Sequence, residues 1–359
     1  MTQKTLKIYQ LESNTVCSPY RLVFPGDALN RLTDIEVKLL PDFGQKECDE
    51  ILREADIFII QRMEWIDHLG ELIAALNRRG IIVVYDLDDD LMRLEPGSRQ
   101  AALNLPDYAV RVEKCIRACQ AVQCATPALA AQLTGVHPEV AVLENQLDRV
   151  PAFSEKAASS AIPIVAYAAG TDHAHDWATV RDAYNRTIAD LASNGVEVET
   201  WVVGDAAIFN SIASLRKRFF PIVAREEYLG LLGRADVSII PLKDIVFNES
   251  KSDVKYLECA SVGTPVVASK VVYGCTIDEG KTGLLFGNAE EFKTQLMRLI
   301  TERPLARNLA REAHRYVSEH RLIDQHVSEW ERVYKRWHAG RAELLTGGGN
   351  ARQPQIARA

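Results

Sequence analysis

The sequence has no long hydrophobic run. Its 359 residues contain no stretch of about 18 uncharged apolar residues, and residues 1–14 lack the apolar segment of a signal peptide. Seven cysteines without a CxxC pair argue against a disulfide framework or a cysteine metal site. Lys and Arg number 42 against 49 Asp and Glu, so broad electrostatic binding of nucleic acid is not expected. We therefore expect a cytoplasmic protein.

The residues that are present have the pattern of a globular α/β protein. Apolar residues make up 47% and charged residues 25%, and the length suits two domains. Short apolar runs alternate with segments that have the 3.6-residue period of amphipathic helices, which indicates parallel strands joined by helices. The expected strands are 6–11, 36–40, 56–61, 81–87, 121–126 and, more weakly, 140–145, followed by 163–170, 198–205, 236–242 and 264–269.

The strand pattern starts twice, which predicts two Rossmann-like domains that face each other across a cleft. In open α/β sheets, ligands bind beyond the carboxyl ends of the strands, so the candidate site lies in the loops there. We expect a first domain over 1–150, a linker over 151–162, a second domain over 163–320, a helix over 321–343 that packs back toward the first domain, and a disordered tail over 344–359.

The segment FNESKSDVKYLECASVGTPVVAS, residues 247–269, carries the most information. It predicts a helix that begins between Ser250 and Ser252 and ends at Gly263, followed by a buried strand. A helix N-terminus concentrates free N–H groups and positive dipole, so Asn248, Lys251 and Ser252 can hold a diphosphate there. Glu258 lies about two turns farther along, roughly 9 to 10 Å away at 1.5 Å per residue, which suits a carboxylate on a ribose.

Here the sequence resembles the GT-B glycosyltransferases of family 4 over about residues 160–340. These enzymes carry an E-x7-E element followed by a G-x-P-V-[VI]-A strand, and this chain has Glu258 followed by GTPVVA at 263–268. The stretch IDEGKTGLLF at 277–286 resembles the family's next loop and turn. The resemblance implies a GT-B fold, a nucleotide diphosphate sugar as donor, retention of configuration, and no cofactor or bound metal.

One residue departs from the family element. Ser250 occupies the position of the first Glu, which contacts the donor sugar in the family. The form N-x-x-K-S-x-x-K-x-x-E resembles a subgroup found among bacterial surface-polysaccharide transferases. The resemblance implies that Glu258 binds the ribose and that Lys251 and Ser252 meet the phosphate and the sugar in place of the missing acid.

A second cluster follows the first strand of the second half. Its A-G-T-x-H-x-x-D arrangement resembles a loop of the same subgroup, which assigns Gly170, Thr171, His173 and Asp176 to the donor. No Lys or Arg lies between residues 164 and 180 to neutralise a diphosphate. Alternatives are a helix N-cap with a solvated first turn, or a zinc site of His173, His175 and Asp176. Gly204 follows a buried strand, as in the family's nucleotide loop, or serves as a tight-turn residue.

The acceptor side is expected in the first half of the chain. Tyr20 and Arg21 lie in the loop after the first strand, where Arg21 can meet a phosphate or an acidic acceptor, or be an ordinary surface residue. Asp88 belongs to the acidic run after strand 81–87, which we assign to an acceptor loop or a helix N-cap. A hydrophobic strand before Asp86 also suggests a magnesium-dependent phosphatase with Asp86 as nucleophile.

These observations predict a glycosyltransferase that moves a sugar from a nucleotide diphosphate donor to a glycan or lipid-linked acceptor, in surface polysaccharide or glycoconjugate synthesis. Lys251 and His173 are the expected catalytic residues, and Ser250 is counted with the donor-binding set. An inactive GT-B binding or scaffold protein is the alternative. The basic last helices, with Trp330, Tyr334 and Trp337, either touch an anionic membrane at its inner face or brace the first domain.

Overall fold

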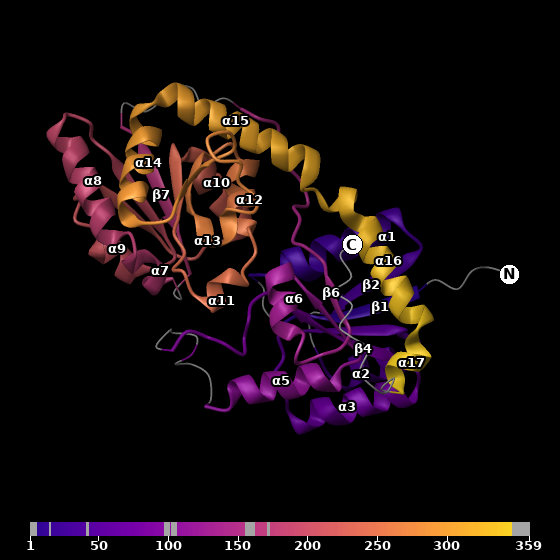
Figure 1. Cartoon of the computed structure of the whole chain (residues 1–359). Coiled ribbons are helices and arrows are strands. Elements are labelled where there is room, and N and C mark those ends of the chain that lie inside the picture. The colour runs from indigo at the N-terminus through magenta and orange to yellow at the C-terminus, as the bar shows by residue number, and fades with distance from the viewer. Residues whose placement is uncertain are drawn as a thin grey trace.

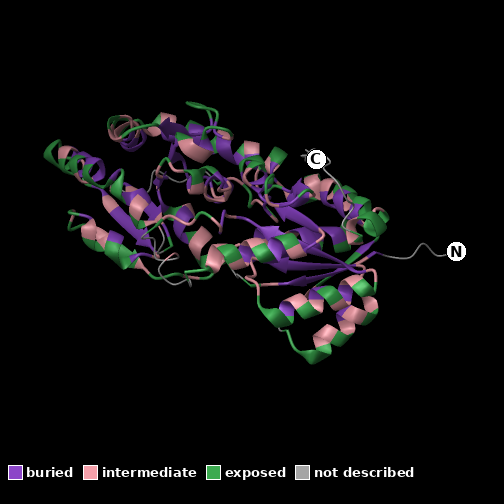
Figure 2. Ribbon diagram, turned by 60° about the horizontal axis from the view of Figure 1, so that its bottom comes forward, coloured by how far each residue is buried: buried purple, intermediate pink, exposed green. Residues whose placement is uncertain are grey.

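The computed structural model describes residues 6–13, 16–40, 43–96, 101, 106–154, 162–170 and 173–346. These residues form two lobes, each built on a six-stranded parallel sheet with helices on both faces (Figure 1). Most strand residues are buried, whereas the outer helices alternate between buried and exposed positions (Figure 2). This is the arrangement expected when near-continuous apolar strands are covered on both sides by amphipathic helices.

The first sheet has the order β2-β1-β3-β4-β5-β6, and its six strands match the six predicted ones. Its strands are β1 (Leu6–Leu11), β2 (Ile35–Leu40), β3 (Ile57–Gln61), β4 (Ile82–Leu87), β5 (Ala121–Cys124) and β6 (Val140–Val142). Its helices are the π-helical turn η1 (Pro19–Val23), α1 (Phe24–Leu32), α2 (Gln45–Glu54), α3 (Asp67–Arg78), α5 (Tyr108–Ala118) and α6 (Pro127–Leu133).

The second sheet has the order β12-β11-β10-β7-β8-β9. Its strands are β7 (Ile164–Ala168), β8 (Glu199–Val203), β9 (Lys217–Phe220), β10 (Val237–Ile240), β11 (Val266–Ser269) and β12 (Leu284–Phe286). Its helices are α7 (Ala174–Ala178), α8 (Arg181–Ser193), α9 (Ala206–Ser211), α10 (Arg225–Arg234), α11 (Val246–Glu249), α12 (Val254–Ser261), α13 (Lys270–Tyr273) and α14 (Ala289–Thr301). The two edge strands, β9 and β12, were not predicted, because β9 is half-exposed and basic and β12 has only three residues.

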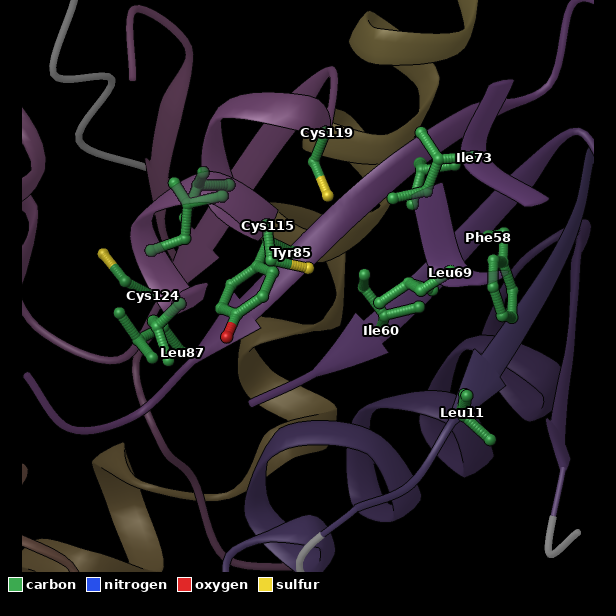
Figure 3. Close-up of a cluster of buried hydrophobic side chains, with 14 of the residues drawn as sticks. Leu11, Phe58, Ile60, Leu69, Ile73, Tyr85, Leu87, Cys115, Cys119 and Cys124 are labelled. Atoms are coloured by element: carbon green, nitrogen blue, oxygen red, sulfur yellow. The ribbon is translucent and has the colours of Figure 1, made fainter. Parts of the chain in front are cut away.

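The first lobe has a hydrophobic core on each face of its sheet. On one face, Phe58, Ile60 and Tyr85 from the strands pack against Leu69 and Ile73 of α3 (Figure 3). Three cysteines, Cys115, Cys119 and Cys124, lie in the same core as free thiols (Figure 3). They serve as small apolar side chains, which agrees with the absence of a CxxC pattern.

The last helices cross from the second lobe to the first. Helix α15 (Arg303–His320) lies along the second lobe, and α16 (Ile323–Ala339) packs beside α1 of the first lobe (Figure 1). Trp330, Tyr334 and Trp337 are buried in the first lobe's core, so these aromatic side chains are not available to a membrane surface. Of the two alternatives for these helices, the structure supports the one in which α16 braces the first lobe.

The predicted disordered tail over 344–359 is wrong at residues 344 and 345. Helix α17 (Arg341–Leu345) includes Leu344 and Leu345, which are partly buried against the core of the first lobe. The rest of that prediction, 347–359, lies outside the described residues, as do 155–161 of the predicted linker. Among the helices that the structure describes, none is long and apolar enough to cross a membrane.

Candidate active site

The two lobes meet where β4 and β10 end. Asp89 follows β4 and accepts a hydrogen bond of 3.3 Å from the Lys251 ammonium of the second lobe. Lys243, which follows β10, pairs with Glu95 of the first lobe. Both loops lie at carboxyl ends of parallel strands, where the sequence pattern placed the site.

The helix of the 250s begins later than predicted. Residues 246–249 form the separate short helix α11, Ser250 to Ser252 are not helical, and α12 starts after Asp253. The Asp253 carboxylate accepts hydrogen bonds from Arg321 at 2.6 and 3.1 Å and from Thr276 at 2.8 Å, so tertiary contacts hold the residue before the helix. Gly263 ends α12 at φ +68°, a conformation that favours glycine, as predicted.

Glu258 is buried on α12 and is held by residues of both lobes. One carboxylate oxygen accepts a hydrogen bond from Tyr20 of the first lobe, and the other accepts from Tyr228 at 3.1 Å. Arg225 donates to the Tyr20 hydroxyl at 3.1 Å. Burial raises the pKa of Glu258, although the tyrosine hydroxyls and Arg225 oppose that shift. Tyr228 and Arg225 were not singled out in the sequence, since no local pattern marks them.

His173 lies between a carboxylate and an ammonium group. Its Nδ1 is 2.7 Å from Asp176, and its Nε2 is 3.1 Å from Nζ of Lys255 on α12. Burial and the charge of Lys255 lower the pKa of His173 to about 4, so the ring is neutral at pH 7. The ring therefore donates from Nδ1 to Asp176 and accepts at Nε2 from Lys255.

The zinc alternative does not fit this arrangement. An ammonium group occupies the position beside Nε2 of His173 where a metal ion would bind. His175 is directed elsewhere, with Nδ1 3.9 Å from Glu95 of the first lobe. Among the described residues, no group of three or more His, Cys, Asp or Glu side chains is arranged to hold a metal ion.

The side-chain amide of Asn248 donates a hydrogen bond to Asp176. Its buried amide donates to Asp176 at 2.8 Å and to the carbonyl oxygen of Lys243 at 2.9 Å. Although burial opposes the shift, the hydrogen bond from His173 lowers the pKa of Asp176. Asp176 is therefore an ionised carboxylate that ties the β7–α7 loop to the loop after β10.

The two serines have different positions. Ser250 is fully buried, and its hydroxyl donates to the carbonyl oxygen of Val246 at 3.4 Å, so its assignment to the donor stays a prediction. Its own carbonyl oxygen accepts from Thr126, the N-cap of α6 in the first lobe, at 2.8 Å. Ser252 is half-exposed and accepts from Asn145 at 2.9 Å, so it lies at the junction of the lobes.

The glycines of the donor loops are differently constrained. Gly170 is exposed at the end of β7, and a Cβ there would contact nothing within 4 Å. Gly204 has φ +101°, and a Cβ there would lie 2.2 Å from the carbonyl oxygen of Ala169. Gly204 is thus required for close packing of the loop after β8 against the loop after β7. Thr171 lies outside the described residues.

Arg21 is not on the acceptor surface. Its guanidinium is fully buried and donates to Asp86 at 2.9 and 3.1 Å and to Asn145 at 3.0 Å. Asp86 also accepts from Gln61 at 3.3 Å and Gln123 at 2.8 Å. The prediction for Arg21 is therefore wrong, and Asp86 is enclosed by protein donors, which excludes it as the nucleophile of a phosphatase in this conformation.

Asp88 and Asp89 share Arg62, a residue that the sequence analysis missed. Arg62 contacts Asp88 at 3.2 Å and Asp89 at 3.7 Å, and its backbone has φ +52°, which is uncommon for a residue with a side chain. Burial raises the pKa of Asp88. Burial also acts to raise the pKa of Asp89, but the charges of Lys251 and Arg62 outweigh it, so the pKa of Asp89 is lowered. The acidic run is thus a charge-balanced edge of the cleft.

The comparisons with known proteins concern the whole fold and one part of the sequence. A family model described as "Glycosyl transferases group 1" matches residues 180–302, which include Lys251, Lys255 and Glu258. A sequence search of curated proteins finds no match. Sucrose-phosphate synthase from Thermosynechococcus elongatus superposes with a TM-score of 0.64 and 14% identity, over 93% of this chain and 100% of that one. The fold is GT-B.

Two further GT-B structures resemble the chain at similar levels. HepE from Anabaena, solved with UDP and glucose, has a TM-score of 0.59 and 16% identity, over 91% of this chain and all of that one. A trehalose-6-phosphate synthase studied with bisubstrate glycomimetics for glycosyl transfer with retention has a TM-score of 0.59 and 14% identity, over 92% and 99% of the two chains. The predicted GT-B fold is confirmed. Lys251, just before α12, contacts the first lobe, and Lys255 on α12 contacts the loop after β7.

Proposed function

We propose that this protein is a glycosyltransferase that moves a sugar from a nucleotide diphosphate donor to a hydroxyl group of a glycan or lipid-linked acceptor. The observation that carries the proposal is the placement of one buried carboxylate, Glu258, and two lysines, Lys251 and Lys255, on the segment leading into and along α12. This segment lies inside the part of the sequence that matches the glycosyltransferase model. A carboxylate and cations at this spacing suit a ribose beside a diphosphate.

Different site residues bind the ribose, the diphosphate and the sugar of the donor in this proposal. Glu258, oriented by Tyr20 and Tyr228, accepts hydrogen bonds from the ribose hydroxyls. Positive charge at the start of α12 stabilises the charge that develops on the leaving diphosphate, a preorganised electrostatic contribution on the order of 3 kcal/mol per donor. In this proposal, neutral His173, which Asp176 fixes through Nδ1, contacts the transferred sugar.

The transfer breaks the bond between the anomeric carbon and the phosphate oxygen and forms one to the acceptor oxygen. The acceptor proton passes to the leaving phosphate, and the configuration is retained. We assign the acceptor to the edge formed by Arg62, Asp88 and Asp89, opposite α12. The donor is a substrate, so the reaction needs no cofactor, and we propose that it proceeds without a bound metal ion. Closure of the two lobes excludes water and so suppresses hydrolysis.

The proposal is tested with a panel of nucleotide sugars. Stabilisation against thermal unfolding by UDP, GDP, ADP or dTDP in the presence of EDTA supports a donor site that works without metal. Release of the nucleoside diphosphate that depends on an added glycan or lipid-linked acceptor then supports transfer. No binding of any of the four diphosphates would contradict the proposal.

A second candidate is a GT-B protein that binds nucleotide sugars without turnover. Ser250, in place of the first acidic residue, is the observation that favours it, because its buried hydroxyl is bonded to the backbone and does not supply a carboxylate to the sugar. Nucleotide-sugar binding without release of nucleoside diphosphate, across the acceptor panel, would select this candidate. The Ser250→Glu variant would be compared with the wild type in the same assay.

A further inference from the structure

Lys255 and Lys251 lie four residues apart but have different partners. Nζ of Lys251 is 3.3 Å from Asp89 across the cleft and 4.4 Å from the ring centre of Phe247. Nζ of Lys255 is 3.1 Å from Nε2 of neutral His173, and among the described residues it has no carboxylate within 4 Å. The charge of Lys251 is thus largely neutralised by a partner, whereas that of Lys255 is not.

The surroundings of Lys255 offer further hydrogen-bond donors, although Asp176 and Glu258 lie close enough to favour its charged form. It is half-buried in the first turn of α12, where no side chain caps the helix, and the amide N–H groups of Val254 and Lys255 have no acceptor among the residues that the structure describes. The loop after β7, which packs against this turn, contributes no Lys or Arg between residues 164 and 180. An ammonium group and unpaired N–H groups at a helix N-terminus are the donors that a phosphate requires.

We propose that Lys255 is the residue that binds the diphosphate of the donor, and that Lys251 instead links the two lobes through Asp89. This assignment rests on the proposed function, because it specifies where the diphosphate lies in that site. Lys255 projects from α12 toward the loop after β7, and Glu258 lies three residues farther along the same helix. One helix therefore presents a cation for the diphosphate and a carboxylate for the adjoining ribose.

A pH dependence distinguishes Lys255 from other cations of the cleft. Burial and the charge of Lys251 lower the pKa of Lys255 to about 8, although Asp176 and Glu258 oppose the shift. His173, the remaining titratable group that faces Lys255 from α7, is neutral above about pH 6 because its pKa is about 4. Lys255 therefore loses its proton as the pH rises through about 8, and diphosphate binding weakens over that range.

The experiment measures binding of UDP and of uridine by titration calorimetry, with GDP, ADP and dTDP as the other diphosphates. We expect Lys255→Met to raise the Kd of the tightest-binding diphosphate roughly 10- to 100-fold, the range for loss of a charged hydrogen bond, and to leave binding of its nucleoside unchanged. Lys251→Met should raise the Kd of that diphosphate less than 5-fold, because the charge of Lys251 is already paired with Asp89 and such pairs contribute little. Lys293→Met is the matched control. Lys293 lies on α14 and pairs at 2.7 Å with Asp190 of α8, away from the candidate site.

The pH profile is the second measurement. Between about pH 7 and pH 9.5, the wild type should lose diphosphate affinity, whereas Lys255→Arg should keep it, because a guanidinium stays protonated. Normal diphosphate binding by Lys255→Met, or a greater loss in Lys251→Met, would overturn the inference and leave the proposed function standing. No diphosphate binding by the wild type would contradict both.

Discussion

The Tyr20 hydroxyl of the first lobe donates a hydrogen bond to the Glu258 carboxylate of the second lobe, although the two residues are 238 positions apart in the sequence. Both side chains are buried, and Tyr228 and Arg225 complete the cluster. The proposed ribose-binding carboxylate is therefore oriented by a residue from the opposite lobe, so that the closed arrangement of the lobes and the geometry of the donor site depend on each other.

Replacing Tyr20 tests this coupling. We predict that Tyr20→Phe weakens nucleoside diphosphate binding about 10-fold, because Glu258 loses a hydrogen bond to a charged group, worth about 1.5 to 3 kcal/mol, and with it a fixed orientation. Titration calorimetry measures the change. Tyr184→Phe is the control, because it removes a buried hydroxyl that hydrogen-bonds to Thr200 at 2.7 Å and lies apart from the candidate site. It should leave diphosphate binding unchanged. Tighter binding in Tyr20→Phe would mean that Tyr20 competes with the ribose.

The negative charge of Asp89, which pairs with Lys251, should weaken the binding of a nucleoside diphosphate. Asp89→Asn preserves the shape of the side chain and removes one negative charge beside the proposed diphosphate position. We predict a 2- to 5-fold tighter binding of nucleoside diphosphate, since two unit charges about 4 Å apart interact by about 1 kcal/mol in water. The gain should shrink at high salt. Asp190→Asn is the control on the far side of the lobe. Weaker binding would show that Asp89 helps to position the donor.

The buried pair of Arg21 and Asp86 should be essential to stability rather than to donor binding. We predict that Arg21→Met lowers the free energy of unfolding by about 3 to 5 kcal/mol, because it leaves the Asp86 carboxylate buried without its cation. Arg31→Met, which breaks an exposed pair with Asp324, should cost no more than about 1 kcal/mol. Urea unfolding gives both values. A loss below about 1 kcal/mol for Arg21→Met would mean that Gln61 and Gln123 suffice to satisfy Asp86.

The low pKa of His173 has a consequence for stability in mild acid. The folded protein holds His173 neutral down to about pH 4, whereas the unfolded chain takes up the proton near pH 6.5, so stability falls as the pH drops between these values. His173→Gln should therefore lose less stability than the wild type between about pH 7 and pH 5. His68→Gln, at an exposed histidine, should keep the slope of the wild type. Equal slopes in all three proteins would contradict the buried, neutral state of His173.

Much of the architecture was predictable, because it follows from local patterns. The buried parallel strands were identified by short apolar runs, and the end of α12 by Gly263, whose φ of +68° suits a residue without a side chain. The missed strands, β9 and β12, are edge strands, and their pairing partners rather than their own composition make them strands. The start of α12 was misplaced because Arg321, 68 residues away, determines the position of Asp253.

The site divides in the same way. The amino-acid sequence alone placed Glu258, Lys251 and His173 beyond the carboxyl ends of the second sheet, since strand order and helix period indicate those positions, whereas Lys255 was not singled out. Only the tertiary structure decided which of the two lysines pairs directly with a carboxylate. Lys251 pairs with the carboxylate of Asp89, whereas Lys255 contacts the neutral ring of His173. Arg21 pairs with Asp86 inside the first lobe and is therefore not at the surface. Charge and exposure depend on partners more than 60 residues away, and no local pattern encodes those distances.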